Sequence, residues 1–290
     1  MIAVIFSEKD IASLNIKERL RELGYLKDAI GKLDNNLAYR FKDILFVTIK
    51  KDLIYADYLD ALLKDYQISL YIFASRHKSE SEIPALLTHT TGNWTDKALF
   101  GGSPNSLAIA PAIALKYAYQ RLNYYVDEYK LRDKFMVSYE VSHHGPTNLS
   151  IPLIFIELGS SPENWRDEKG ATVLANTIID LAENYNTLLN SDFEIAIGFG
   201  GSHYCPSFSN LILNSPYAFG HIAPKYAFDA GMKPEMIIQA YHRTYPKPKY
   251  AILDWKGLKK EYRDIVISKA EELGLTVKKT KEIEKDRSCQ

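Results

Sequence analysis

The chain of 290 residues lacks several features that mark specialised classes of protein. It has two cysteines, Cys205 and Cys289, which argues against a disulfide framework and favours a reducing compartment. No apolar run approaches the length that spans a bilayer. The first ten residues, MIAVIFSEKD, lack the basic start and the small-residue cleavage site of a secretory signal. We therefore expect a cytoplasmic protein with no membrane partner.

The chain also carries no net charge, because its 36 basic residues balance its 36 acidic residues. The overall charge therefore gives no sign of a polyanionic partner. The charges are nevertheless spread unevenly, since residues 243–290 hold 13 basic and 8 acidic residues. This basic C-terminal segment predicts either a phosphate-contacting patch or a solvated helical surface of mixed charge, and the charge pattern alone favours the second.

What is present is the pattern of an α/β protein. Hydrophobic residues make up 46% and charged residues 25%, as in ordinary globular domains. Short apolar runs typical of buried strands alternate along the chain with segments of helical periodicity. This alternation predicts a sheet whose strands are connected by crossover helices. Asp10 is a natural cap for the first helix and Gly24 a natural end. The strands are expected at 2–7, 44–49, 68–74, 135–141, 153–158 and 193–199, and the longer helices at 10–24, 106–129 and 171–185.

No repeat, low-complexity segment or linker divides the chain, so we expect residues 1–290 to form a single α/β domain. Three stretches rich in Gly, Pro, Ser, Thr and His are expected to be long functional loops: 75–104, 142–152 and 200–233. The chain is expected to end in a basic β-α-β element over residues 246–290.

Six of the seven histidines lie in these loops. Three groups directly follow predicted strands, where the sites of open α/β sheets usually lie. We expect the loops to converge and to bring several imidazoles together, which favours a metal site or acid–base catalysis. His242 lies on a predicted helix and is interpreted as a structural or surface residue. The loop histidines are His77, His89, His143, His144, His203 and His221.

Two carboxylates accompany these histidines. Glu157 lies in an apolar strand, where a buried carboxylate needs a partner. It is either a functional residue of the histidine site or a structural residue that hydrogen-bonds to a neighbouring loop. Glu140, three residues before His143, is placed to orient a metal ligand without being one. Imidazole and carboxylate donors suit zinc, although the spacing matches no standard pattern such as His-Glu-x-x-His.

Nucleophilic alternatives have weaker support. Cys205 is close to His203, but a buried packing residue or a soft metal ligand is the more common use of such a cysteine. The sequence contains no Gly-x-Ser-x-Gly elbow. It also contains no phosphate-binding Walker loop and no dinucleotide fingerprint.

Several multi-residue blocks occur in a characteristic order between residues 70 and 260. Together they resemble the archaeal and plant type of D-aminoacyl-tRNA deacylase, and the combination is far more specific than any single block. The blocks are Ser-Arg-His-Lys-Ser (75–79), Leu-Thr-His-Thr-Thr-Gly-Asn (87–93), Ser-His-His-Gly-Pro-Thr (142–147), Phe-Ile-Glu-Leu-Gly-Ser (155–160), Gly-Phe-Gly-Gly-Ser-His-Tyr (198–204) and Gly-His-Ile-Ala-Pro-Lys-Tyr (220–226).

The resemblance implies a zinc-requiring hydrolase that cleaves the ester between a D-amino acid and the terminal ribose of tRNA. It also implies a three-layer fold of the phosphorylase/peptidyl-tRNA hydrolase type, with a mixed, mostly parallel sheet and helices on both faces. The implied partner is aminoacyl-tRNA. No stable protein partner is implied, and the chain is expected to be a monomer or a homodimer.

The resemblance carries over to individual positions. The expected metal ligands are His143, His144, His203 and His221, and the expected catalytic residues are His89, His143, His144, Glu157 and His203. The expected substrate contacts are His77, Asn93 and Tyr204. This sequence departs from the family pattern at Ser142, where threonine is usual, and at Ser207, where arginine often occurs. The second departure removes a phosphate or carboxylate contact that the loop would otherwise offer.

The expected mechanism is attack of an activated water on the ester carbonyl. The candidates for holding the oxyanion are the metal or the backbone N–H groups of Gly200 and Gly201, and the candidates for moving the proton are Glu157 or an imidazole not bound to metal. The basic segment from Lys247 to Arg263, including Lys259 and Lys260, is the candidate for contacts with the tRNA backbone, which predicts binding that weakens steeply with salt.

Two other functions remain open at this point. A zinc-dependent amidase or peptidase acting on a small substrate would use the same histidine loops and would not bind tRNA. A non-catalytic nucleic-acid-binding protein would use the basic segment and stack bases on the 20 tyrosines. The tyrosines are scattered, however, and this second alternative leaves the loop histidines without a role.

Overall fold

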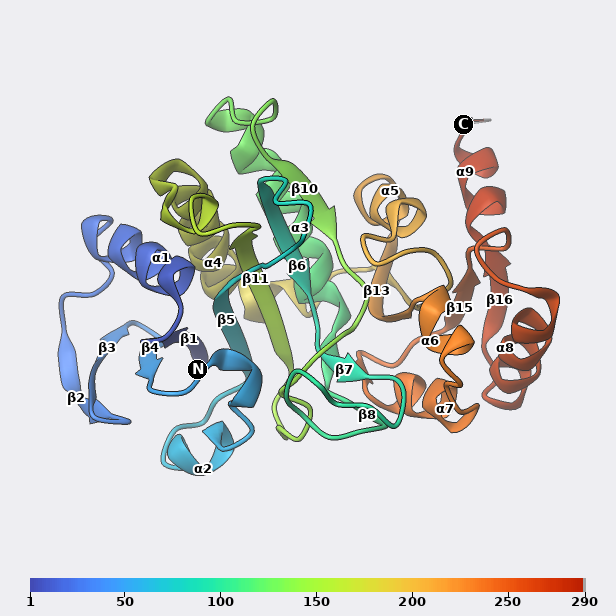
Figure 1. Cartoon of the computed structure of the whole chain (residues 1–290), viewed down its shortest axis with the longest axis horizontal. Helices are drawn as coiled ribbons and strands as arrows, with labels where there is room; N and C mark the ends of the chain where they lie inside the picture. The colour runs from blue at the N-terminus through green and yellow to red at the C-terminus, as the bar shows by residue number, and fades with distance from the viewer. Residues whose placement is uncertain (289–290) are drawn as a thin grey trace.

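A computed structural model describes residues 1–288 of the chain, so Cys289 lies outside the described residues. Its centre is an eight-stranded sheet in the order β10-β6-β11-β5-β1-β4-β3-β2 (Figure 1). The strands, in chain order, are β1 (Ile2–Ser7), β2 (Ala29–Leu33), β3 (Asn36–Phe41), β4 (Ile44–Ile49), β5 (Leu70–Arg76), β6 (Ala85–His89), β10 (Met136–Tyr139) and β11 (Leu153–Gly159).

The sheet is mixed and mostly parallel, which confirms the predicted fold class. β1 pairs in parallel with β4 and β5, β5 with β11, and β6 with β10. Antiparallel pairing occurs between β6 and β11 and within the β2-β3-β4 meander. The central strands β1, β4 and β5 are almost entirely buried, so they read as continuous apolar runs.

Helices cover both faces of this sheet. α1 (Ile11–Glu22), α3 (Ala112–Glu128) and α4 (Glu168–Leu188) pack on one face, where they contact β5, β6 and β11. The Asp10 side chain accepts a hydrogen bond from Ser13 N and caps α1, and Gly24 follows that helix with φ +89°. The short helices η1 (Leu53–Tyr55) and α2 (Leu59–Leu62) bury Leu53 and Leu59 on the opposite face.

A second sheet of four strands lies beside the first, in the order β13-β12-β15-β16, and all its pairs are parallel. Its strands are β12 (Glu194–Phe199), β13 (Tyr217–Ala223), β15 (Tyr250–Leu253) and β16 (Thr276–Lys279). β15, α8 (Lys260–Glu272) and β16 form the expected C-terminal β-α-β element. One hydrophobic core includes residues of both sheets, such as Ile72, Ile156, Phe219 and Ile252. This continuity is consistent with a single α/β unit.

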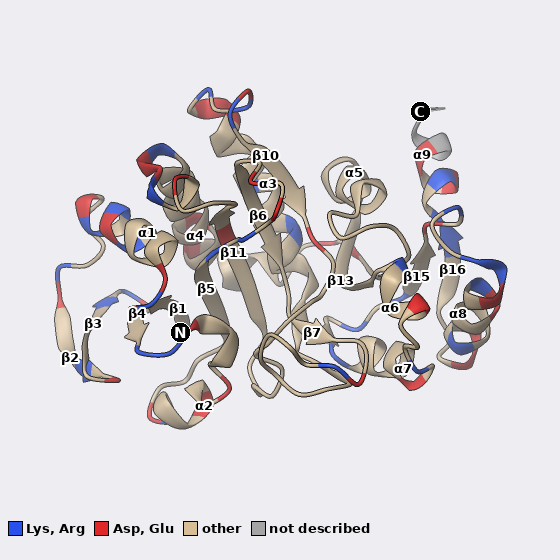
Figure 2. Cartoon of the chain, viewed as in Figure 1, with Lys and Arg blue, Asp and Glu red and all other residues tan. Residues whose placement is uncertain are grey.

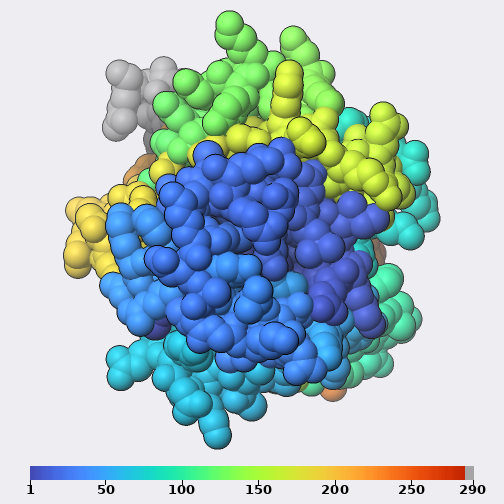
Figure 3. Space-filling model, turned by 90° about the vertical axis from the view of Figure 1, so that its left-hand side faces the viewer, coloured from blue at the N-terminus to red at the C-terminus, as the bar shows by residue number. Residues whose placement is uncertain are grey.

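The remaining elements are short or lie at the periphery. They are β7 (Gly92–Asn93), β8 (Ser106–Leu107), β9 (Ala110–Pro111), η2 (Asn164–Arg166), α5 (Pro206–Asn214), α6 (Lys225–Asp229), α7 (Glu235–His242), β14 (Thr244–Tyr245) and α9 (Thr280–Ser288). The N-terminal segments cover one end of the molecule and the C-terminal element forms the other (Figures 1 and 3). In the part of the chain that the structure describes, no helix is long and apolar enough to cross a membrane.

Two of the three predicted loops are more ordered than expected. The segment 75–104 contains β6, a buried strand between β10 and β11, and 200–233 contains α5, β13 and α6. The loop structure predicted for both segments was wrong because buried strands of five to seven residues, flanked by Pro, Ser and Thr, show no alternation that separates them from a loop. The segment 142–152 has no helix or strand, as predicted. The helix expected from residue 106 begins only at Ala112, after Pro111.

Candidate active site

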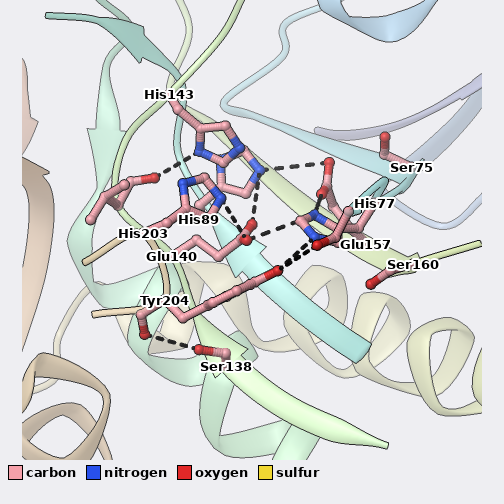
Figure 4. A network of polar contacts seen from close by, with 12 residues as sticks. Ser75, His77, His89, Ser138, Glu140, His143, Glu157, Ser160, His203 and Tyr204 are labelled. Atoms are coloured by element: carbon pink, nitrogen blue, oxygen red, sulfur yellow. Dashed lines mark hydrogen bonds and ion pairs between the residues drawn. The ribbon is translucent and has the colours of Figure 1, made fainter. Parts of the chain in front are cut away.

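Five histidines and two glutamates converge where several strands end (Figure 4). His77 follows β5, His89 ends β6, and Glu140 directly follows β10, whereas Glu157 lies within β11. His143 and His144 come from the loop after β10, and His203 from the loop after β12. The prediction that the histidine loops meet is therefore confirmed for these five residues.

The two carboxylates lie at the centre of the cluster and are both buried. Glu157 lies 3.4 Å from Nδ1 of His77 and 3.6 Å from Nε2 of His89. One oxygen of Glu140 lies 3.0 Å from Nε2 of His203. Both Glu140 oxygens nevertheless lack a hydrogen bond of good geometry. A buried carboxylate in this state is expensive unless a cation or proton is close to it.

Three of the histidines share an arrangement that leaves one ring nitrogen free. Nδ1–H donates to a backbone carbonyl in each: His89 to Thr90 (2.9 Å), His143 to Val141 (2.9 Å) and His144 to Gly145 (2.6 Å). The three rings offer ligand atoms that all lie within 4.8 Å of one another. Nε2 of His89 is buried without a hydrogen-bond partner. Metal-binding histidines are typically oriented in this way, with the second nitrogen donating to a carbonyl.

The electrostatics divide these groups into two sets. Burial, reinforced by the neighbouring imidazoles, holds the pKa of His143 well below its usual range, and burial lowers the pKa of His144 to about 4. These two rings are therefore neutral at physiological pH. Burial also opposes charge on His89, but contact with Glu157 outweighs it and raises the pKa of His89. Burial alone would raise the pKa of Glu157. Contacts with His77 and His89 have the larger effect, so the pKa of Glu157 is lowered and this carboxylate is ionised.

The backbone around the histidine pair is tightly constrained. His144 has φ +45°, a conformation that residues other than glycine seldom adopt and that is concentrated at functional sites. At Gly145 a Cβ atom would lie 2.2 Å from the backbone N of Gly102, so only glycine allows the two loops to pack this closely. The indole N–H of Trp94 donates to the carbonyl of Ser142 and fixes the start of the loop (2.8 Å).

Residues of the cluster line two cavities. The first, which we call the aromatic cavity, has a volume of about 340 Å³ and is walled by Trp94, Lys97, Leu99, Phe100, Tyr226 and Ala230. The second, which we call the acidic cavity, has a volume of about 600 Å³ and includes Asp10, Asp52, Arg76, Glu80, Glu82 and Glu157. Phe100, His143, His144 and His203 line both, so the histidines lie at the junction of the two cavities.

His221 is not part of the cluster, contrary to the expectation that it binds metal. It lies in the buried strand β13, and both its ring nitrogens are occupied. Nε2–H donates to the carbonyl of Ala108 (3.0 Å), and Nδ1 accepts from the hydroxyl of Ser142 (2.8 Å). His221 therefore supports the loop that carries His143 and does not offer a ligand atom.

Most other predicted contacts lie near the cluster. Tyr204 places its hydroxyl 3.2 Å from Nε2 of His77. Asn93 lines the aromatic cavity, but its side-chain amide donates to the carbonyls of Gly101 and Ser103 and so holds the adjacent loop. Cys205 is buried and burial raises the pKa of its thiol strongly, so it is not an activated nucleophile.

Gly200 does not offer the expected oxyanion contact, whereas the prediction for Gly201 stays a prediction. Gly200 donates its N–H to the carbonyl of Ala223 (2.8 Å), so this group is not available to a substrate. Gly200 and Gly201 have φ values of +109° and +80°, and they make the turn that carries His203 back to the cluster. The expectation for Gly200 was wrong, because sequence cannot show which backbone groups already have partners.

Sequence reasoning missed the residues that wall the cavities. Tyr226 lies on α6, with its hydroxyl 3.3 Å from Nδ1 of His203. Phe100 and Leu99 are exposed by 65% and 75% next to the histidines. The only available signal was the cluster of apolar residues within the polar segment 94–104, which is unusual for a surface loop.

Lys259 and Lys260 lie at the start of α8. Lys259 contacts Asp229 (2.8 Å), which ends the helix that carries Tyr226. Figure 2 shows blue and red segments of the ribbon close together along α8, so the basic segment has the mixed character that its sequence favoured.

Comparison with known proteins places these features in a family. The sequence model of the D-aminoacyl-tRNA deacylases matches residues 64–278. The D-aminoacyl-tRNA deacylase of Thermococcus kodakarensis is 41% identical over 95% of this chain and 98% of its own length. That of Methanocaldococcus jannaschii is 34% identical over 88% of this chain and 89% of its own. A crystal structure of a conserved protein of unknown function has a TM-score of 0.87 and 32% identity, covering 99% of this chain and 97% of that one.

Proposed function

This chain belongs to the D-aminoacyl-tRNA deacylase family, and on that premise we propose that it hydrolyses D-aminoacyl-tRNA at the histidine–glutamate cluster. The bond that breaks is the ester between the D-amino acid and the terminal ribose, and the products are free D-amino acid and tRNA. The chain is therefore a hydrolase that removes D-amino acids from mischarged tRNA. The family relationship favours this reaction over the amidase or peptidase alternative. Because the substrate is aminoacyl-tRNA, we propose the cytoplasm as its location.

The observation that carries the proposal is the junction between the two cavities. An aminoacyl ester has two large substituents, the amino acid on one side of the carbonyl and the nucleoside on the other. The cluster lies where the two cavities meet, so an ester bound across that junction places its carbonyl beside His143, His144 and His203. Positioning of this kind supplies much of the acceleration in reactions of activated esters.

Zinc fits the residues that are present. We propose that His89, His143 and His144 hold the ion through Nε2, because each has its Nδ1–H bound to a carbonyl and the three rings offer ligand atoms within 4.8 Å of one another. The buried carboxylate oxygens of Glu140 and Nε2 of His89 have no hydrogen bond, which an ion in this cluster would compensate. Three imidazoles with one open position are a common zinc set, and zinc there would polarise the ester carbonyl and make water more acidic.

The chain's own groups manage the protons. Glu157 is ionised, lies against Nε2 of His89 and lines the acidic cavity, so it is placed to take the proton of the attacking water. His77 bridges Glu157 and Tyr204 and keeps the carboxylate oriented. His203 lies between Glu140 and the hydroxyl of Tyr226 and lines both cavities, so it is placed to return a proton to the leaving ribose oxygen.

Zinc binding is expected to weaken as pH falls. The raised pKa of His89 means that this ring keeps its proton to a higher pH, and zinc must displace that proton to bind. Titrating chelator-treated protein with zinc should restore hydrolysis of D-tyrosyl-tRNA, with about one ion per chain. The zinc concentration needed for half-restoration should rise between pH 8 and pH 6. Full activity in the presence of a strong chelator at every pH would contradict the proposed role of zinc.

A further inference from the structure

The two cavities differ in the charge of their walls. Among the described residues, the aromatic cavity has no Asp or Glu in its wall and one lysine, Lys97. The acidic cavity has five carboxylates in its wall, against Arg76 and Lys78. The ester to be hydrolysed joins a polyanion on one side to an amino acid with a positively charged ammonium group on the other.

We propose that the aromatic cavity binds the 3′-terminal adenosine of tRNA, so that the aminoacyl group points into the acidic cavity. This orientation rests on the proposed deacylase function. The ammonium group then faces carboxylates, and the phosphates of tRNA are kept away from them. The reverse orientation would push a polyanion into the cavity that carries the negative charge.

The walls of the aromatic cavity suit a purine. The rings of Phe100, which is 65% exposed, and Tyr226, which is 48% exposed, stand at its rim without full burial in the protein core. Exposed aromatic rings beside a site are the usual means of holding an unpaired base, because every base offers a face for stacking. Leu99 and Trp94 complete an apolar wall, and Lys97 adds a positive charge.

The surroundings of this cavity also favour a nucleic acid. α6 contributes Tyr226 and is followed by Ala230, both of which line the cavity. The same helix carries Lys225 and Asp229, and Lys259 of the basic segment contacts Asp229 as well. Two lysines share one carboxylate, so these three side chains together carry a net positive charge next to residues that line the cavity. The tRNA backbone beyond the terminal adenosine therefore meets cations on this side.

Ala230 offers a way to block the cavity without changing the core. It is exposed and follows the end of α6, so Ala230→Trp fills the cavity from its rim. Glu80→Trp is the matched control, because Glu80 is exposed and lines only the acidic cavity. A second variant, Leu99→Ala, removes part of the apolar wall at a side chain that is 75% exposed.

The experiment compares the binding of uncharged tRNA that ends in CCA with that of the same tRNA lacking only the terminal adenosine. We expect the wild-type protein and Glu80→Trp to bind the complete tRNA about tenfold more tightly, because stacking of one base contributes an effect of this order. Ala230→Trp should reduce the difference to less than about twofold, and Leu99→Ala should reduce it partly, with binding of the truncated tRNA unchanged.

Equal binding of the two tRNAs by the wild-type protein would overturn the proposal. So would a tenfold difference that survives in Ala230→Trp, or one that is lost in Glu80→Trp. The measurement does not depend on turnover. A protein that binds the terminal adenosine but does not cleave the ester would therefore refute the deacylase function and leave this site standing.

Discussion

Replacing His143 with alanine is expected to lower kcat for D-tyrosyl-tRNA by at least roughly 1,000-fold. The ring of His143 lies close to three other histidine rings, with centroids 4.2 Å from His89, 4.5 Å from His144 and 4.5 Å from His203. Its Nε2 is one of the three free nitrogens proposed to hold zinc. The variant should therefore also lose zinc, measured as metal content after dialysis.

The fold should survive this substitution. His143 is only partly buried and lies in an irregular loop, so its loss removes few core contacts. We expect cooperative thermal unfolding with Tm lowered by less than about 5 °C. His242→Ala is the matched control, because His242 is exposed at the end of α7 and outside the cluster. Full activity in a folded His143→Ala protein would remove this residue from the mechanism.

Glu157→Gln should separate proton transfer from metal binding. The substitution keeps the shape of the side chain and removes the charge that accepts the proton. We expect kcat to fall by about 100- to 10,000-fold while zinc content stays at the wild-type level. Because contact with His77 and His89 keeps the pKa of Glu157 low, the wild-type carboxylate is ionised at physiological pH and the loss should appear there.

The control for this prediction is Glu80→Gln, which removes a charge from the same cavity at an exposed position. If Glu157 acts only through the field of the cavity, both variants should lose activity to a similar degree. A large loss restricted to Glu157→Gln supports direct proton transfer. Loss of zinc from Glu157→Gln would instead make this residue a ligand and would contradict the role proposed for it.

The parts of the fold that sequence predicted were those with strong local signals. β1 and α1 were placed correctly because an apolar run, the capping residue Asp10 and the terminal glycine Gly24 lie within one short stretch. β6 and β13 were missed because each is short, buried on both faces and flanked by loop-forming residues. The order of strands in the sheet depends on pairings between distant residues, which no local pattern encodes.

The candidate site was predicted in composition but not in detail. The histidine-rich blocks identified the family and the cluster, because several of them occur in one order. His221 looked like a ligand since Gly-His-Ile-Ala-Pro reads as a loop, yet the residue lies in a strand with both nitrogens occupied. Glu140 was expected to orient other groups, and its contacts with His77, His89 and His203 are consistent with that role. The cavities could not be predicted, because α6 and the loop at 94–104 meet only in the folded chain.

The most direct test of the central claim is release of tyrosine from matched D-tyrosyl-tRNA and L-tyrosyl-tRNA. Each ester would be incubated with wild-type protein, with chelator-treated protein and with zinc restored. We predict rapid hydrolysis of the D ester, little hydrolysis of the L ester, loss of activity with chelator and recovery with zinc. Hydrolysis of neither ester by zinc-loaded protein, or equal hydrolysis of both, would contradict the assignment of this cluster as the site of D-aminoacyl-tRNA deacylation.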